Sequence, residues 1–150
     1  MKTYVITVSR HFLKAHTRSG QPTNFVSGIL GQSKIHTIRA NFEFWSERIQ
    51  EVQEGRAILS IRYWTGKPYN SSQAVVIDLD SSHGVGFEKM QIATSIGTVR
   101  VNGTYHAIGK VAKADGLTTI DFLDWFSKAE TTHDFVLIHF TPFRYADKSA

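Results

Sequence analysis

The chain is 150 residues long, which is typical of one domain, and its 41% apolar and 20% charged residues predict a globular fold with a buried core. It has no cysteine, which excludes disulfides, thiolate metal ligands and a thiol nucleophile, so a reducing compartment, the cytoplasm, is the expected location. The net charge of +4 favours an anionic partner such as RNA, although many basic proteins bind no nucleic acid.

The N-terminal part predicts a strand, a basic loop and a short helix. Residues 3–8 alternate and favour β-branched and aromatic types, which indicates a strand; this segment is too short for a signal peptide, and no apolar run in the chain approaches a membrane span. Residues 9–21 form a basic loop. Thr23 is a candidate N-cap for a helix over residues 25–30, which Gly31 closes in the left-handed conformation.

The next predicted strand, residues 34–39, is unusually polar. A structural strand alternates apolar and polar residues, but here both faces carry hydrogen-bonding groups. These are Lys34, His36, Thr37 and Arg39. Two interpretations are open: an edge strand protected by charge, or a strand that lines a polar cleft.

A helix and two strands follow. Asn41 is a candidate N-cap for a helix whose apolar residues recur at spacings of three and four and which ends at Gly55. Strands are predicted over residues 57–64 and 73–79, and the segment 64–70 between them is rich in turn residues.

Several residues in and after the first of these strands are candidate ligand contacts. Arg62 and Trp64 share a face and offer a cation and a stacking surface, and stacking of a base on an aromatic ring contributes about 1–3 kcal/mol. Lys67 and Tyr69 add a second cation and a second aromatic ring. A solvated arginine beside a partly buried tryptophan explains the first pair equally well.

The C-terminal half predicts more strands, two helices and a last strand. Strands are predicted over residues 85–93 and 98–101. A helix over residues 105–114 stops at Asp115 and Gly116, and Thr118 caps a second helix. Residues 134–141 form the final strand, before a frayed tail at 145–150. There is no repeat or linker, so one domain spans residues 1–150.

Neither a metal nor a cofactor is expected from the sequence. The seven histidines are scattered without a ligand spacing, and no phosphate-binding or dinucleotide-binding glycine pattern is present.

The segment from Gly31 to Arg39 resembles the ASCH domain, a family related to the RNA-binding PUA domains. Its signature of a glycine, a lysine and an arginine near the start of a strand fits Gly31, Lys34 and Arg39. Thr37 stands where many members carry glutamate, and in this respect the chain resembles a bacterial subgroup that removes the acetyl group from N4-acetylcytidine. Residues 64–69 resemble a segment of similar bacterial proteins.

This resemblance implies an α+β fold, a PUA-like mixed β-barrel with peripheral helices that the C-terminal strand closes. For the amidohydrolase subgroup it also implies three catalytic residues: Thr37 as nucleophile, Lys34 as base, and Asp115 in the place of a glutamate. Aspartate is shorter by one methylene, and a residue at a helix end is the structural alternative for this position. Lys34 and Thr37 are three apart, so they share a cleft only if Lys34 precedes the regular strand.

Three functions are therefore expected, in this order. The first is a PUA-like module that binds RNA or a modified nucleoside through a basic cleft with Lys34, Arg39, Arg62 and Lys67. The second is an N4-acetylcytidine amidohydrolase, and the third is a protein-interaction module. The sequence leaves the natural ligand and the oligomeric state open.

Overall fold

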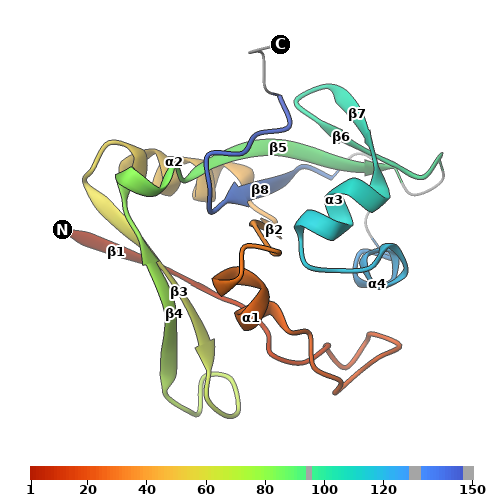
Figure 1. Cartoon of the computed structure of the whole chain (residues 1–150), viewed down its shortest axis with the longest axis horizontal. Coiled ribbons are helices and arrows are strands. Elements are labelled where there is room, and N and C mark those ends of the chain that lie inside the picture. The colour runs from red at the N-terminus through yellow and green to blue at the C-terminus, as the bar shows by residue number, and fades with distance from the viewer. Residues whose placement is uncertain (94–95, 129–132, 147–150) are drawn as a thin grey trace.

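The computed structural model describes residues 1–93, 96–128 and 133–146, and it shows an α+β fold with two open sheets (Figure 1). The helices are α1 (Phe25–Leu30), α2 (Phe42–Gln53), α3 (Ile108–Ala114), α4 (Thr119–Trp125) and the short 3-10 helix η1 (Ser81–His83). The strands are β1 (Lys2–Thr7), β2 (His36–Arg39), β3 (Ala57–Trp64), β4 (Gln73–Leu79), β5 (Gly86–Ala93), β6 (Thr98–Val101), β7 (Thr104–Ala107) and β8 (Phe135–His139).

The smaller sheet has the strand order β1-β3-β4 and lies at one side of the molecule in Figure 1. Its first two strands are parallel, whereas β3 and β4 are antiparallel with an irregularity between Ile61 and Arg62. A parallel pair needs a crossover connection, and here the chain forms α1, β2 and α2 between β1 and β3. This crossover therefore includes the loop after β1 and the polar strand β2.

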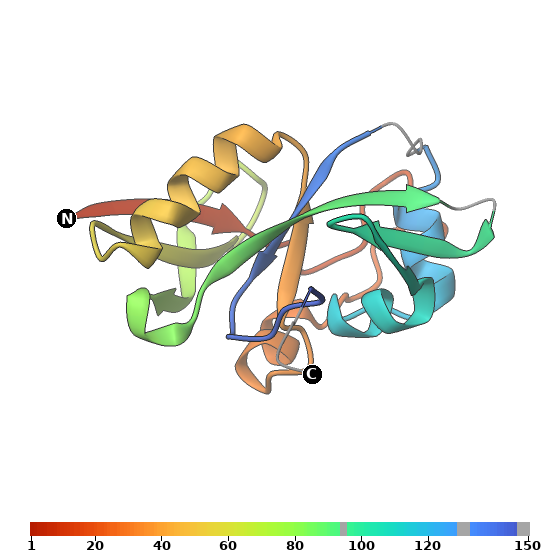
Figure 2. The ribbon, with the colours of Figure 1, turned by 90° about the horizontal axis from the view of Figure 1, so that it is seen from above.

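The larger sheet is antiparallel, with the order β2-β8-β5-β6-β7. Strand β5 alternates between buried and half-buried residues along its whole length and crosses the molecule from α2 toward α3 and α4 (Figure 2). Helix α2 contacts β3, β5 and β8, so its apolar face joins the two sheets into one core. This core includes Ile49, Leu59 and Leu137, which are fully buried.

The predicted closed barrel is wrong, because both sheets stay open in the part of the chain that the structure describes. Strand β2 is an edge strand that pairs only with β8. The guanidinium of Arg39 donates to the carbonyl of Thr7 at the end of β1, so a side chain rather than a ladder of main-chain hydrogen bonds spans this gap. At the other edge, β7 runs directly into α3. The α+β class itself agrees with the prediction.

Several local features differ from the sequence analysis. The N-cap of α1 is Asn24 instead of Thr23, and Asn41 precedes α2 without a side-chain capping hydrogen bond. Gly31 has φ −87°, and Gln32 takes the left-handed conformation that was expected of the glycine. Residues Thr104–Ala107 form β7, and the predicted helix begins only at Ile108. Tyr145, which was assigned to a frayed tail, is buried; residues 147–150 of that tail lie outside the described residues. None of the helices within the described ranges is long and apolar enough to cross a membrane.

Candidate functional site

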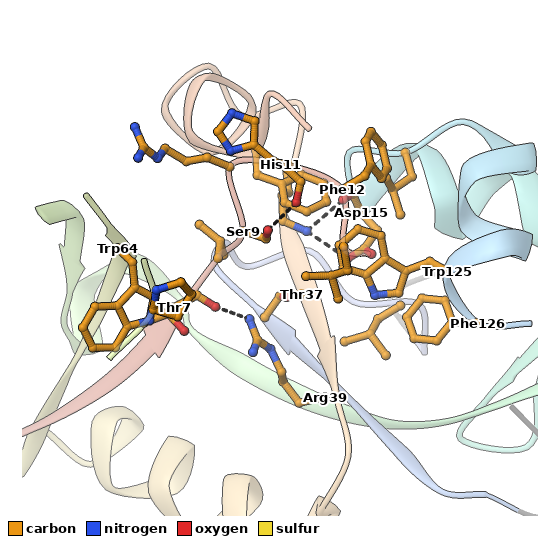
Figure 3. Close-up of a pocket in the computed structure, with 18 of the residues that line it drawn as sticks. Thr7, Ser9, His11, Phe12, Thr37, Arg39, Trp64, Asp115, Trp125 and Phe126 are labelled. Atoms are coloured by element: carbon orange, nitrogen blue, oxygen red, sulfur yellow. Dashed lines mark hydrogen bonds and ion pairs between the residues drawn. The ribbon is translucent and has the colours of Figure 1, made fainter. Parts of the chain in front are cut away.

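A pocket of about 560 Å³ opens between the end of β1, strand β2 and the segment between α3 and α4 (Figure 3). Its polar lining comes from the end of β1 and the loop after it, from β2 and the residues before it, and from the end of α3. Its apolar lining is largely aromatic. The lining residues used below are Thr7, Arg10, Phe12, Phe25, Lys34, Thr37, Arg39, Trp64, Tyr69, Asp115 and Trp125.

Lys34 lies two residues before β2, outside the regular strand. It forms an isolated antiparallel bridge with Asp115, which brings the end of α3 beside it. Gly28 and Gly116 allow this close approach, because a Cβ atom at either position would lie 3.3 or 3.1 Å from Lys34 Cβ. Lys34 therefore meets the geometric condition that the sequence analysis set for sharing a cleft with Thr37, and both residues line the pocket.

The Lys34 side chain is almost completely buried, with 2% of its area exposed. Its Nζ donates to the main-chain oxygen of Asp115 at 2.8 Å and to Oδ1 at 3.2 Å, and lies 4.3 Å from the centre of the Phe25 ring. Burial lowers the pKa of Lys34, the carboxylate of Asp115 opposes this effect, and the charge of Arg39 adds to it. A lysine amine with a lowered pKa is a better general base near neutral pH.

Asp115 follows the last residue of α3 and its backbone N–H returns to carbonyls of that helix. Its Oδ1 atom also lies 3.1 Å from Nδ1 of His36, so one carboxylate oxygen serves two partners. Gly116 follows with φ +81°, a conformation that reverses the chain at low cost only for glycine. The turn after α3 thus brings the carboxylate to the lysine.

Thr37 and Arg39 lie on the pocket wall, with Thr37 between Asp115 and Arg39 in Figure 3. Within the described ranges, the Thr37 hydroxyl has no hydrogen-bond partner. Arg39 donates through Nη2 to the carbonyl of Thr7 at 2.6 Å, but its buried Nε atom has no partner there and no carboxylate pairs with it. Burial lowers the pKa of Arg39, and Asp115 opposes this effect. A half-buried cation without a counter-ion is partly desolvated, which marks Arg39 as a contact for a ligand oxygen.

Aromatic rings line the rest of the pocket. Trp64 and Tyr69 contact each other with ring centres 5.1 Å apart, and Tyr69 is 87% exposed. On the other side Trp125 packs against Phe12 and Phe25, with both pairs of ring centres 5.8 Å apart. The pocket therefore combines flat apolar walls with a polar floor.

The structure brings together most of the predicted site residues, but not all of them. Lys34, Thr37, Arg39, Trp64, Tyr69 and Asp115 all line this pocket. Arg62 lies outside its lining and donates to Ser60 Oγ at 2.8 Å, and Lys67 is exposed in the β3–β4 loop and also lies outside it. The basic cleft that was predicted to include all four cations is thus divided: Lys34, which is buried, and Arg39, which is half-buried, line the pocket, and the other two do not.

No family model, curated protein or solved structure matches the chain. The ASCH resemblance therefore stays a prediction. Within residues 1–93, 96–128 and 133–146, no three histidine or carboxylate side chains are placed to hold a metal ion.

Sequence reasoning missed several residues at the site. His36 was treated as one of seven scattered histidines, although it lies between Lys34 and Thr37 in the sequence. Phe25 and Trp125 lie in predicted helices and were not named as ligand contacts, and both line the pocket. Arg10, which also lines it, lay in a segment described only as a basic loop; its guanidinium lies 4.8 Å from the centre of the Tyr63 ring.

Proposed function

We propose that this protein is an amidohydrolase that removes the acetyl group from N4-acetylcytidine or a closely related acylated nucleoside. The observation that carries the proposal is the pocket shared by Lys34, Thr37 and Asp115, in which the lysine is buried and its pKa lowered. A pocket of about 560 Å³ with aromatic walls has the size and character of a site for one small planar ligand. The cytoplasm is the proposed location, in keeping with the lack of cysteine.

The first half of the reaction transfers the acetyl group to the enzyme. The Thr37 hydroxyl oxygen attacks the acetyl carbonyl, and neutral Lys34 takes the hydroxyl proton. When the C–N4 bond breaks, Lys34 returns this proton to N4, so that cytidine leaves and an acetyl ester remains on Thr37. Two N–H bonds of the Lys34 amine point to Asp115, which leaves its lone pair for Thr37.

The second half regenerates the enzyme. A water molecule attacks the ester, Lys34 takes its proton and passes it to the departing Thr37 oxygen, and acetate leaves. The sum is hydrolysis of one amide by one water. Arg39 supports both halves through its guanidinium, because the carbonyl oxygen gains negative charge in each tetrahedral intermediate.

The test is to incubate the purified protein with N4-acetylcytidine and to follow cytidine release by chromatography. We expect release by the wild type, none by Lys34→Ala or Thr37→Val, and partial activity in Thr37→Ser, which keeps a hydroxyl. Mass spectrometry of a rapidly quenched reaction should locate the acetyl ester on Thr37. The absence of cytidine release at high enzyme concentration would reject the proposal.

A second candidate is binding of an unpaired RNA base or modified nucleoside without hydrolysis, for which the exposed ring of Tyr69 against Trp64 is the specific support. This candidate predicts that Tyr69→Ala weakens binding of single-stranded RNA by about 1–3 kcal/mol. It also predicts a steep dependence of that binding on salt. Failure to bind RNA at low salt would exclude it.

A further inference from the structure

Behind the pocket, a chain of buried polar residues connects Asp115 to the C-terminal segment. His36 is fully buried; its Nδ1 lies 3.1 Å from Asp115 Oδ1, and its Nε2 lies 2.8 Å from the hydroxyl of Tyr145. Neither His36 nor Tyr145 lines the pocket, so neither touches a ligand there. Their contacts nevertheless end on the carboxylate that holds Lys34.

The hydrogen-bonding groups determine which nitrogen of His36 carries the proton. A carboxylate only accepts hydrogen bonds, so Nδ1 is the donor toward Asp115, and Nε2 accepts the hydroxyl hydrogen of Tyr145. Tyr145 keeps that hydrogen, because burial and the charges of Asp115 and Glu88 raise its pKa. The two contacts therefore support the same tautomer.

Tyr145 is itself held from the opposite side by Glu88. Glu88 Oε1 accepts the backbone N–H of Tyr145 at 2.8 Å and lies 2.8 Å from Nε2 of His139, and its Oε2 accepts the backbone N–H of Ala146 at 3.0 Å. Asn102 donates to Oε2 at 2.9 Å. With these four partners, the Glu88 carboxylate fixes the backbone at Tyr145 and Ala146, and hence the position of the Tyr145 hydroxyl.

We propose that His36 is a positioning residue that sets the carboxylate of Asp115 against Lys34, and that Tyr145 holds His36 in the tautomer this requires. The inference rests on the proposed function, since Asp115 affects the reaction through Lys34. In this arrangement Asp115 Oδ1 interacts with both His36 and Lys34, so only part of its negative charge acts on the lysine. The amine therefore has a fixed orientation without a full ion pair.

Two substitutions at position 36 separate positioning from packing. His36→Asn keeps a donor close to the place of Nδ1 and loses the contact to Tyr145, whereas His36→Gln keeps a group near Nε2 and loses the donor to Asp115. We expect His36→Gln to lower kcat on the order of 10²-fold with KM within about twofold, because misplacement by about 1 Å has effects of that size. His36→Asn should keep kcat within about fivefold of the wild type.

Tyr145→Phe provides a second test that leaves the ring and its packing in place. The Tyr145 ring contacts those of His139 and Phe143, with centres 5.9 and 4.9 Å apart, and phenylalanine keeps these contacts. The substitution should lower kcat several-fold in the wild type and have no added effect in His36→Asn, which has no group at Nε2. Melting temperatures measured in parallel show whether each variant is folded.

An NMR titration of the Lys34 side chain tests the inference without any substrate. His36→Gln should raise the pKa of Lys34, because Oδ1 then interacts with the lysine alone, whereas His36→Asn should leave it unchanged. If the wild type releases no cytidine, the proposed function fails, while this titration still decides the role of His36. Equal effects of the two substitutions on kcat and on the pKa of Lys34, whether large or absent, would overturn the positioning role.

Discussion

The Lys34 side chain lies over Gly116, where an added Cβ atom would come within 3.1 Å of Lys34 Cβ and 3.3 Å of its Cγ and Cδ. Gly116 also needs a positive φ of 81°. Two features therefore favour glycine at position 116: its positive φ and the close approach of the Lys34 side chain. Four predictions follow from this site and its surroundings.

Gly116→Ala should lose more stability than an equivalent glycine substitution elsewhere. Gly103 has nearly the same backbone, φ +85°, but open space around the place of a Cβ. Alanine in this conformation costs about 1–2 kcal/mol at either position, and the contact with Lys34 adds to the loss at Gly116 alone. Urea denaturation of Gly116→Ala and Gly103→Ala measures the difference, and equal losses would show that Lys34 moves aside freely.

Lys34→Arg should abolish catalysis although it preserves the positive charge. A guanidinium does not lose its proton in proteins, so it cannot serve as the base, and loss of a general base costs about 10²–10⁴ in kcat. Lys113→Arg, at an exposed position on α3, is the matched control and should behave like the wild type. Substantial cytidine release by Lys34→Arg would rule out general-base catalysis by this residue.

Arg39→Met should reduce activity without reducing stability. The substitution removes a half-buried cation that has no counter-ion, which offsets the loss of its hydrogen bond to Thr7, so we expect an unfolding free energy within about 1 kcal/mol of the wild type. The loss of a donor to the carbonyl oxygen should lower kcat/KM by about 10²–10³. Arg62→Met, outside the pocket, should leave kcat/KM unchanged. A clear loss of stability in Arg39→Met would assign Arg39 to the fold instead of the reaction.

Acid should destabilise the protein through His139. Burial lowers the pKa of His139 from 6.5 to about 4, an effect that its hydrogen bond to Glu88 partly opposes and the charge of Arg144 increases. Between pH 6.5 and about pH 4, His139 is protonated in the unfolded chain but not in the folded chain. The free energy of unfolding therefore falls as the pH falls through this range. The loss from this group is on the order of 3 kcal/mol.

The pKa of Glu88 changes stability in the same direction. Burial alone would raise it, but the hydrogen bonds from His139, Tyr145 and Ala146 together lower it, so the folded state loses stability when acid protonates the carboxylate. Denaturation of the wild type and His139→Gln between pH 7 and pH 4 separates the two groups. The variant should have the shallower slope, and identical slopes would contradict the assignment to His139.

Local pattern predicted much of the secondary structure. The alternation in residues 57–64 and the apolar run in residues 73–79 predicted strands at the observed bounds, because successive side chains of a strand point to opposite faces of the sheet. The apolar spacing after Asn41 likewise predicted α2, which packs on both sheets. Residues 105–107 were misassigned to a helix because so few residues cannot establish a period, and the pairing of β7 with β6 decides the outcome.

Three of the predicted site residues lie close together in the sequence, whereas Asp115 was predicted only through the family resemblance. Lys34, Thr37 and Arg39 belong to one polar segment, which attracts notice because neither face of it suits a core. The contact between His36 and Tyr145 spans 109 positions and leaves no local signal. Arg62 and Lys67 have the right chemistry but face elsewhere, since the direction of a side chain depends on packing that the strand period alone does not specify.

The pairing of β2 with β8 also bears on how the protein folds. Lys34 and Asp115 are 81 positions apart, and β2 contacts a strand about a hundred residues later in the chain. Contacts of such long range form slowly, because the entropy of closing a large loop is lost before they contribute. After dilution from denaturant, helix α2 and the β3–β4 pair should acquire structure first, and the capacity to hydrolyse substrate should return only in the slowest phase.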